Sequence, residues 1–325
     1  MRMSHISVSI IIPVYNVSAY IERCINSVIC QTYPCKECII VDDASLDDSI
    51  DKCKSIIEEY NGPIDFMLLH HNVNRGLSAA RNTGTNAATG DYLFYLDSDD
   101  KLSNQCIEKL VAHINDDRSI EMVQGSYMCI NNSKKEIHCT RDISIENNDA
   151  ARRQYLKYRN LNYTVWNKLL KRSFVLDYKL YNKEGILNED LLWTFYLIKY
   201  LSHAYLSSEI TYFYYIRPDS ITGKRLEERG LFFIQIYDEI LRDLTRGKER
   251  DEIDGYLMNF CRLYATYNRS VPEFKRILCL YQTQAKRFKC WKTNVSLSIL
   301  SLVCICFNPN GFLTILYRAR RKWVK

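Results

Sequence analysis

The segment "GDYLFYLDSDDKLS" carries three carboxylates, Asp97, Asp99 and Asp100, directly after an apolar run. Like charges this close together at the edge of a core disfavour one another's ionised form, so we expect a cation beside them. Lys101, in the same segment, is one candidate. A divalent ion is another, because Mg²⁺ typically binds one or two carboxylates together with substrate phosphates. Asp97, Ser98 and Asp99 could supply its ligands next to a diphosphate.

A second acidic pair, Asp42 and Asp43 in "VDDAS", follows another apolar run, and Tyr15 follows a third in "IIIPVYN". If these runs are neighbouring parallel strands, the ring of Tyr15 lies beside the two carboxylates. That combination suits a nucleobase, which stacks on an aromatic face and donates an N–H to a carboxylate. Arg75 and Arg81, in "NRGLSAARNTG", could add positive charge for the phosphates of the same ligand.

Each of these residues also fits a plainer role. An aspartate at a strand end is commonly the N-cap of the next helix, which would be enough for Asp47 or Asp100. Arg81 could be a solvated helix residue, and Tyr15 could be ordinary packing. Their joint placement at one edge of one sheet favours the ligand-binding interpretation.

Hydrophobic periodicity indicates which elements would position these side chains. The apolar runs show no alternation, and each is followed by a segment with helical spacing, which is typical of a mostly parallel α/β sheet with helices on both faces. Right-handed crossovers put the carboxyl ends of such strands at one edge, where open α/β sheets bind ligands. The predicted strands are residues 8–12, 37–43, 64–70, 91–97 and 120–130. The predicted helices among them are residues 18–32, 45–60, 76–90 and 103–116.

The pattern is looser beyond residue 130. A polar stretch runs to about Asn148, residues 189–201 predict a helix, and residues 209–222 predict a strand that runs into a turn. The spacing from residue 224 to residue 289 is helical.

Composition limits the classes of function. The 325 residues are 47% hydrophobic and 25% charged, as in ordinary globular proteins. Of 44 basic residues, 11 lie from Phe274 onward, where Asp and Glu are absent, so 33 basic and 38 acidic residues give the preceding body a charge of about −5. An acidic body argues against nucleic-acid binding, which needs a basic face. The thirteen cysteines show no framework spacing, which indicates reduced thiols and a cytoplasmic protein.

The basic C-terminal tail predicts a further partner. Residues 295–307 are apolar but too few to cross a bilayer, which takes about 20 residues, and a basic amphipathic piece that includes Trp323 follows them. One interpretation is a helical hairpin packed on the body. We favour a peripheral anchor on the anionic cytoplasmic face of the inner membrane, because a packed helix rarely carries so many uncompensated cations.

Four segments, in this order, resemble the family 2 glycosyltransferases of GT-A fold, especially those of bacterial surface-polysaccharide synthesis: "VSIIIPVYN", "SVICQTYPCKECIIVDDASLDDS", "NRGLSAARNTGTNAATGDYLFYLDSDD" and the later "NED". The match is looser at "VWNKLLKRSF" and "YYIRPDSIT", and "DDAS" replaces the more frequent "DDGS". The resemblance implies an inverting, metal-dependent transfer from a nucleotide-sugar, expected to be a UDP-sugar, to a saccharide or polyprenyl-linked acceptor. It also implies a Rossmann-like GT-A domain at residues 1–223, with a nucleotide-binding half at 1–130 and an acceptor half at 131–223, before a helical region at 224–325.

The resemblance also assigns roles to single residues. Asp43 would line the base pocket, Asp97 would reach the ribose, and Asp99 would hold Mg²⁺ or Mn²⁺ against the diphosphate. Arg217 would close over the phosphates. The implied nucleotide-sugar site comprises Pro13, Tyr15, Asp42, Asp43, Arg75, Arg81, Asp97, Ser98 and Arg217.

Inversion requires a base on the face opposite the leaving diphosphate. "LNEDLLW" puts Glu189 and Asp190 ahead of an apolar helix, where matching the helix dipole would also explain them. The family's base matches Asp190, which would take the proton of the acceptor hydroxyl. Trp166, Lys168 and Glu189 would shape the sugar and acceptor site. A shift of one residue would exchange the roles of the two acids.

Two other functions compete with this one. A nucleotidyltransferase would need a glycine-rich phosphate loop near its N-terminus, and "IPVYNVSAY" has none. A catalytically inactive saccharide-binding or scaffold protein is disfavoured by the presence of both Asp99 and Asp190. A dehydrogenase is excluded, because no G-x-G-x-x-G follows the first strand.

Overall fold

The computed structural model describes residues 5–131 and 134–217, and positions 232, 235–237, 239–240 and 242–243. The chain divides into two compact units, residues 1–218 and 219–325. The predicted boundary after residue 223 and the basic tail lie outside the described residues. The sheet and the candidate site both belong to the first unit.

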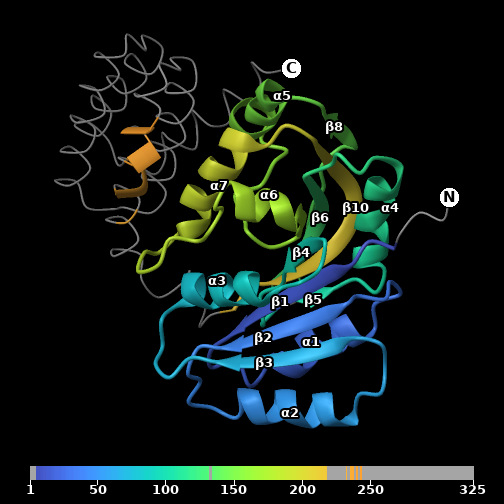
Figure 1. Ribbon diagram of the computed structural model, residues 1–325, viewed down its shortest axis with the longest axis vertical. Helices are drawn as coiled ribbons and strands as arrows, with labels where there is room; N and C mark the ends of the chain where they lie inside the picture. The colour runs from blue at the N-terminus through green and yellow to red at the C-terminus, as the bar shows by residue number, and fades with distance from the viewer. Residues whose placement is uncertain are drawn as a thin grey trace. The chain divides into compact units, whose positions relative to one another are not determined.

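Ten strands of the described residues form one sheet (Figure 1). They are β1 (Val8–Val14), β2 (Glu37–Asp42), β3 (Asp65–His70), β4 (Tyr92–Tyr95), β5 (Lys101–Leu102), β6 (Met122–Asn131), β7 (Lys134–His138), β8 (Ile143–Ile145), β9 (Lys168–Lys171) and β10 (Ala204–Tyr215). Their order is β3-β2-β1-β4-β9-β6-β10-β5, with β7 beside β6 and β8 beside β10.

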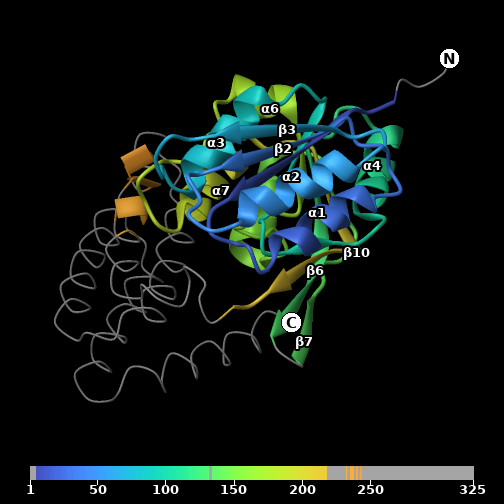
Figure 2. The ribbon, with the colours of Figure 1, turned by 90° about the horizontal axis from the view of Figure 1, so that it is seen from below.

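Helices cover both faces of this sheet. They are α1 (Ile21–Ile29), α2 (Ser49–Glu59), α3 (Leu77–Ala87), α4 (Cys106–Asp116), α5 (Asn148–Arg153), α6 (Arg172–Asp177) and α7 (Glu189–Tyr200), with a π-helical turn at Gln154–Tyr158. The chain runs outward from β1 to β3 and then returns to the other side of β1 for β4. Because crossovers are right-handed, this reversal puts α1 and α2 on one face and α3 on the other (Figures 1 and 2).

The four N-terminal strands confirm the predicted mostly parallel α/β sheet. β1 pairs in parallel with β2 and with β4, and β2 pairs in parallel with β3. Every residue of β1, β2 and β4 is buried, as expected for strands covered on both faces. Their carboxyl ends therefore meet at one edge, which carries the candidate site.

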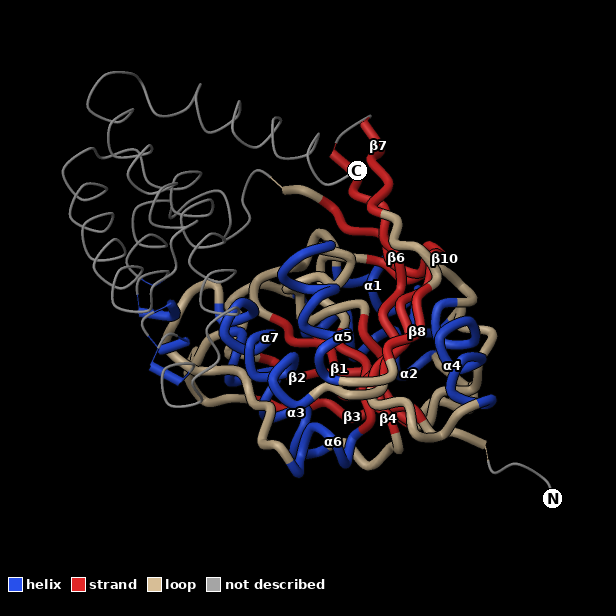
Figure 3. The backbone as a smooth tube through the Cα atoms, turned by 90° about the horizontal axis from the view of Figure 1, so that it is seen from above, coloured by secondary structure: helices blue, strands red, loops and turns tan. Residues whose placement is uncertain are grey.

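Four of the ten strands were not predicted, namely β5, β7, β8 and β9. β9, with the sequence "KLLK", lies antiparallel between β4 and β6. Four residues are too few to show a periodicity, so only the packing of the chain identifies this strand. Beyond it, β10 begins at Ala204, earlier than predicted, and pairs with β6, which pairs in turn with β7 (Figure 3).

Close packing fixes the position of α3 on the sheet. A Cβ atom added to Gly84 would lie 2.4 Å from Cγ2 of Ile11 in β1, so only glycine allows this approach. Arg81 lies less than one turn earlier on the same helix. The tight contact therefore holds Arg81 at the carboxyl edge of the sheet.

None of the described helices is long and apolar enough to span a membrane.

Candidate active site

The turn after β4 presents the predicted acidic cluster. The N–H of Asp100 donates to the carbonyl of Asp97 at 3.0 Å, which closes the turn around Ser98 and Asp99. Ser98 is buried, whereas the side chains of Asp97 and Asp99 keep 22% and 18% of their surface exposed. The two partly exposed carboxylates are therefore the ones that a ligand can reach.

Arg81 supplies one of the expected cations. Its guanidinium binds Asp97 through Nη2 and Glu189 through Nη1, each at 2.8 Å, and its side chain is only 3% exposed. The suggestion of a solvated helix residue is therefore wrong. Burial, the largest influence, lowers the pKa of Arg81, but Asp97 and Glu189 outweigh it and hold the pKa above its ordinary value. Arg81 thus joins the turn after β4 to the start of α7.

Arg217 supplies the second cation. Its Nη2 lies 2.6 Å from Oδ2 of Asp99, and its guanidinium sits 4.7 Å from the ring centre of Tyr20. Burial and then the neighbouring Asp97 raise the pKa of Asp99, although Arg217 opposes them. The prediction placed Arg217 over phosphates, and in this structure it contacts the carboxylate assigned to the metal.

Asp100 has a structural role that the sequence did not reveal. It is fully buried, and it accepts hydrogen bonds from the hydroxyl of Tyr212 at 2.7 Å and the N–H of Tyr215 at 2.8 Å. It is not the N-cap of α4, which is Gln105. Burial, followed by the charges of its acidic neighbours, raises the pKa of Asp100 well above its ordinary value. This carboxyl ties β10 to the acidic turn and so fixes the backbone two residues before Arg217.

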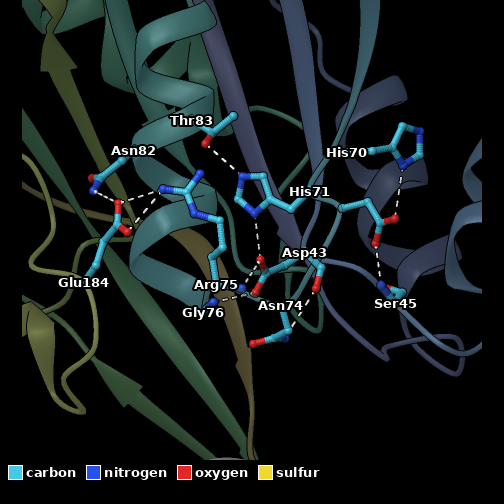
Figure 4. Close-up of polar contacts among 11 residues, drawn as sticks. Asp43, Ser45, His70, His71, Asn74, Arg75, Gly76, Asn82, Thr83 and Glu184 are labelled. Atoms are coloured by element: carbon cyan, nitrogen blue, oxygen red, sulfur yellow. Dashed lines mark hydrogen bonds and ion pairs between the residues drawn. The ribbon is translucent and has the colours of Figure 1, made fainter.

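The acids after β2 are satisfied by different donors (Figure 4). Asp43 is 2% exposed, and it accepts from the N–H groups of Arg75 at 2.8 Å and Gly76 at 2.7 Å. Nδ1 of His71 lies 2.7 Å from the same carboxylate, and Nε2 of His71 lies 2.9 Å from Oγ1 of Thr83 in α3. Asp43 therefore shapes the loop between β3 and α3. Its predicted contact with a base stays a prediction.

Asp42 has a similar internal set of partners. It accepts from the N–H of Ser45 at 2.8 Å, and Nδ1 of His70 lies 3.1 Å from its other oxygen. Ala44, just before Ser45, has a left-handed φ of 61°, which sharpens this turn. The hydrogen bonds of Asp42 and Asp43 thus fix the conformation of the loops at this edge.

Tyr15 and Pro13 lie at the end of β1 as predicted, in different environments. Pro13 is buried within the strand, whereas Tyr15 is 43% exposed. The register pairs Val14 with Asp42, and the N–H of Asp43 donates to the carbonyl of Val14 at 2.9 Å. Tyr15 therefore follows at the level of the acidic pair with its ring accessible, so the ordinary-packing alternative does not hold.

The loop before α7 is tied to α3. Arg75 lies 3.3 Å from Glu184 in a half-exposed ion pair (Figure 4). Asn82 donates to the carbonyl of Asn182 and accepts from its N–H, each at 2.8 Å. Arg75 is thus held by a carboxylate that no sequence pattern pointed to.

The start of α7 brings the two predicted acids to this edge. Glu189 is held by Arg81, and Asp190 accepts the N–H of Leu191 at 2.9 Å. Asn188, just before them, has a left-handed φ of 61° and sets the direction in which the helix starts. The neighbouring acids therefore have different partners, which sequence alone could not tell apart.

Trp166 and Lys168 are buried next to residues of this edge. Trp166 is 8% exposed and stacks on Tyr212 and Tyr214, with ring centres 4.5 and 5.5 Å away. Lys168 is fully buried, and its Nζ donates to the carbonyl and hydroxyl of Thr164. Burial lowers the pKa of Lys168 to about 7, although Asp190 opposes the shift. Both residues thus adjoin residues of the site, and direct contact with an acceptor stays a prediction.

The residues of the acidic turn fit a divalent ion. Among the described residues, no group of three or more His, Cys, Asp or Glu side chains converges as a metal centre. A site for Mg²⁺ or Mn²⁺ that is completed by substrate phosphates needs only one or two carboxylates. Asp99 offers one, and the guanidinium beside it shows that this position attracts a cation.

Sequence reasoning missed Glu184 and Arg23 at this edge, and it did not foresee the structural role of Asp100. Arg23, in α1, donates from Nη2 to the carbonyl of Asp99 and lies 3.7 Å from the ring centre of Tyr215. Its position on a helix that otherwise packs on the core carried no signal of this contact. A carboxylate or guanidinium is visible in a sequence, but its partner is not.

Comparison with known proteins identifies the family. The family model described as glycosyl transferase family 2 matches residues 9–178. The glycosyltransferase GlyA of Streptococcus pneumoniae is 38% identical over 128 residues, which are 39% of this chain and only 18% of GlyA. The GalNAc(5)-diNAcBac-PP-undecaprenol beta-1,3-glucosyltransferase of Campylobacter jejuni is 24% identical over 324 residues, 96% of this chain and 97% of that protein.

The fold is also similar to a solved structure. Residues 1–349 of Staphylococcus aureus TarS, in complex with UDP-GlcNAc, match with a TM-score of 0.71 and 18% identity, over 97% of this chain and 92% of that one. This likeness confirms the predicted fold class. Since the family model covers more than half of the chain, the chain belongs to glycosyl transferase family 2.

Proposed function

We propose that this chain transfers a sugar, with inversion, from a UDP-sugar to a saccharide or lipid-linked saccharide acceptor in surface-polysaccharide synthesis. The observation that carries the proposal is the double ion pair of Arg81. It joins Asp97, at the edge where nucleotides bind in such sheets, to Glu189, which directly precedes the proposed base Asp190. Donor and acceptor groups would thus meet at one point.

The relatives support the choice of substrates. The Campylobacter jejuni protein is by name a glucosyltransferase for an undecaprenol-linked saccharide, and it aligns over almost the whole chain. TarS was solved with UDP-GlcNAc. We therefore propose a uridine nucleotide for the donor and a polyprenyl-linked saccharide for the acceptor.

The donor would bind across the carboxyl ends of β1, β2 and β4. The exposed ring of Tyr15 would stack on the base, above the loop that Asp43 holds in shape. Asp97 would reach the ribose with the oxygen that does not bind Arg81. A Mg²⁺ or Mn²⁺ ion held by Asp99 would supply charge stabilisation for the leaving diphosphate.

Asp190 would act on the acceptor. Its carboxylate would take the proton of the attacking hydroxyl as the new glycosidic bond forms and the bond to the diphosphate breaks. Glu189 is held by Arg81, so its role in this scheme is to orient the start of α7. This division of roles supports Asp190, and not Glu189, as the base.

Two single substitutions test the assignment. Asp190→Asn is nearly isosteric but accepts no proton, so transfer should fall about 10²–10⁴-fold while calorimetry shows unchanged donor binding. Glu189→Gln keeps an oxygen for Arg81 and should be milder. A near-normal turnover of Asp190→Asn beside an inactive Glu189→Gln would show that the base is the other carboxylate. A wild-type chain that binds UDP-sugars but neither transfers nor hydrolyses them would instead be a saccharide-binding protein.

We also propose peripheral attachment to the cytoplasmic face of the inner membrane. The support is the charge of the last 52 residues, with 11 basic and no acidic side chains from Phe274 onward. Each basic residue near an anionic surface contributes roughly 1 kcal/mol of binding. Truncation after Trp291 removes six of these eleven basic residues and the apolar run at 295–307, so it should release the protein from anionic vesicles in co-sedimentation. Equal sedimentation of both chains would reject the anchor.

A further inference from the structure

The two arginines at the acidic turn are held to different degrees. Arg81 is 3% exposed and bound by two carboxylates. Arg217 is 18% exposed and bound by one, Asp99, with the ring of Tyr20 beside it. Arg81 is therefore held firmly, whereas Arg217 has one charged contact among the described residues that it could exchange.

That single contact is made with the carboxylate that we assign to the metal. Oδ2 of Asp99 lies 2.6 Å from the guanidinium, which is the space that a metal ligated by this oxygen would need. A divalent ion placed there would also repel the guanidinium, since both are cations. Arg217 and a metal ion therefore compete for Asp99 as long as no other anion is present.

A diphosphate removes this competition. Its oxygens complete the coordination of the metal and offer a second anion to the guanidinium, whose fork matches phosphate geometry. The exchange requires no movement of β10, because the N–H of Tyr215 stays bound to Asp100. Arg23 likewise holds the backbone carbonyl of Asp99, so the turn keeps its shape.

We propose that Arg217 is the resting counter-ion of Asp99, which excludes the free divalent ion and gives way only to the metal–diphosphate complex. Arg217 is then a specificity-determining residue: it makes metal binding depend on the nucleotide. The inference rests on the proposed metal role of Asp99. It adds that without nucleotide this carboxylate binds the metal poorly, because Arg217 holds it.

The test measures Mn²⁺ binding to the full-length protein without nucleotide, from the electron paramagnetic resonance signal of free Mn²⁺. Arg217→Gln should bind Mn²⁺ about tenfold more tightly than wild type, because a neighbouring arginine weakens proton binding to a carboxylate by about one to three log units and repels a metal cation in the same way. Arg217→Lys keeps the charge and should stay close to wild type. Arg23→Gln is the matched control, since it removes an equal charge that contacts the carbonyl of Asp99 and not its carboxylate. It should change Mn²⁺ affinity less than Arg217→Gln does.

Adding UDP completes the test. UDP should increase the Mn²⁺ affinity of wild type strongly and that of Arg217→Gln much less, because the competitor is already gone. Unchanged or weaker Mn²⁺ binding by Arg217→Gln, with folding verified by circular dichroism, would overturn the inference. Asp99→Asn separates the two hypotheses: if it still binds Mn²⁺ with UDP, the metal role of Asp99 itself is wrong.

Discussion

Two acidic clusters lie at the carboxyl edge of the sheet, and they are neutralised by different groups. After β2, Asp43 accepts from the backbone N–H groups of Arg75 and Gly76. After β4, Asp97 and Asp99 face the side chains of two arginines. The donors to Asp43 belong to the loop between β3 and α3, whereas the cations of the second cluster come from α3 and from the residues just after β10.

The difference separates shape from binding. A backbone N–H cannot leave without unfolding its loop, so the hydrogen bonds of Asp43 keep the edge in one shape whether or not a ligand is present. A guanidinium is the end of a long side chain and can change partners when another charge arrives. The hydrogen bonds of the first cluster thus maintain the shape of the edge, whereas the ion pairs of the second can be exchanged for contacts with a ligand. Substitutions can test this difference.

Arg81→Met should have the largest effect on stability. It leaves Asp97 and Glu189 without their cation at a largely buried position, and breaking a buried pair in this way costs about 3–5 kcal/mol of unfolding free energy. Urea unfolding with metal excluded measures it. A loss below about 1 kcal/mol, the size of a surface pair, would mean that Arg81 is as exchangeable as Arg217.

Asp43→Asn and Asp99→Asn compare the two clusters directly. At Asp43 the amide keeps one acceptor and turns N–H groups toward a backbone donor, so stability should fall by about 2 kcal/mol. Asp99→Asn loses the ion pair with Arg217 but also removes the repulsion between Asp99 and Asp97. The free energy of unfolding should therefore change by less than about 1 kcal/mol. If the urea midpoints of both variants fall equally, the two clusters do not differ in their contribution to stability.

The second cluster should also make stability depend on pH. The pKa of Asp100 is raised in the folded protein, so its stabilising contribution is present below the ordinary pKa of an aspartate, about 4, and is lost as pH rises toward the folded value. Relative to Asp100→Asn, the free energy of unfolding of the wild type should fall by at most about 1.4 kcal/mol per pH unit over that window. The hydroxyl of Tyr212 can reverse its hydrogen bond to suit the amide. If the free energies of unfolding of the two chains change with pH in parallel, folding does not raise the pKa of Asp100.

Arg75→Gln should have the smallest effect. The pair with Glu184 is half-exposed on both sides, and screened surface pairs contribute about 0–1 kcal/mol. Because the N–H of residue 75 still binds Asp43, the loop should keep its shape. A fall of about 2 kcal/mol or more in urea unfolding, which exceeds any surface pair, would mean that the side chain of Arg75 also maintains the shape of the edge.

Much of this edge follows from local patterns. Apolar runs without alternation, each followed by a helix, predict parallel strands whose ends share an edge, and this is where Asp42, Asp43, Asp97 and Asp99 lie. The patterns did not show β9, which is too short to have a period. They also could not show that Trp166 stacks between tyrosines of β10, because the ring partners are remote in the chain.

The sequence by itself determined where the acids stand, because the position of a residue at a strand end depends on periodicity and chain direction, which are local. Only the tertiary structure decided which group neutralises each acid. Arg81 reaches Asp97 because Gly84 lets α3 lie close to β1, and Arg217 reaches Asp99 because Asp100 ties β10 to the turn. An ion pair depends on distances of a few ångströms between segments far apart in the chain, and packing alone sets those distances.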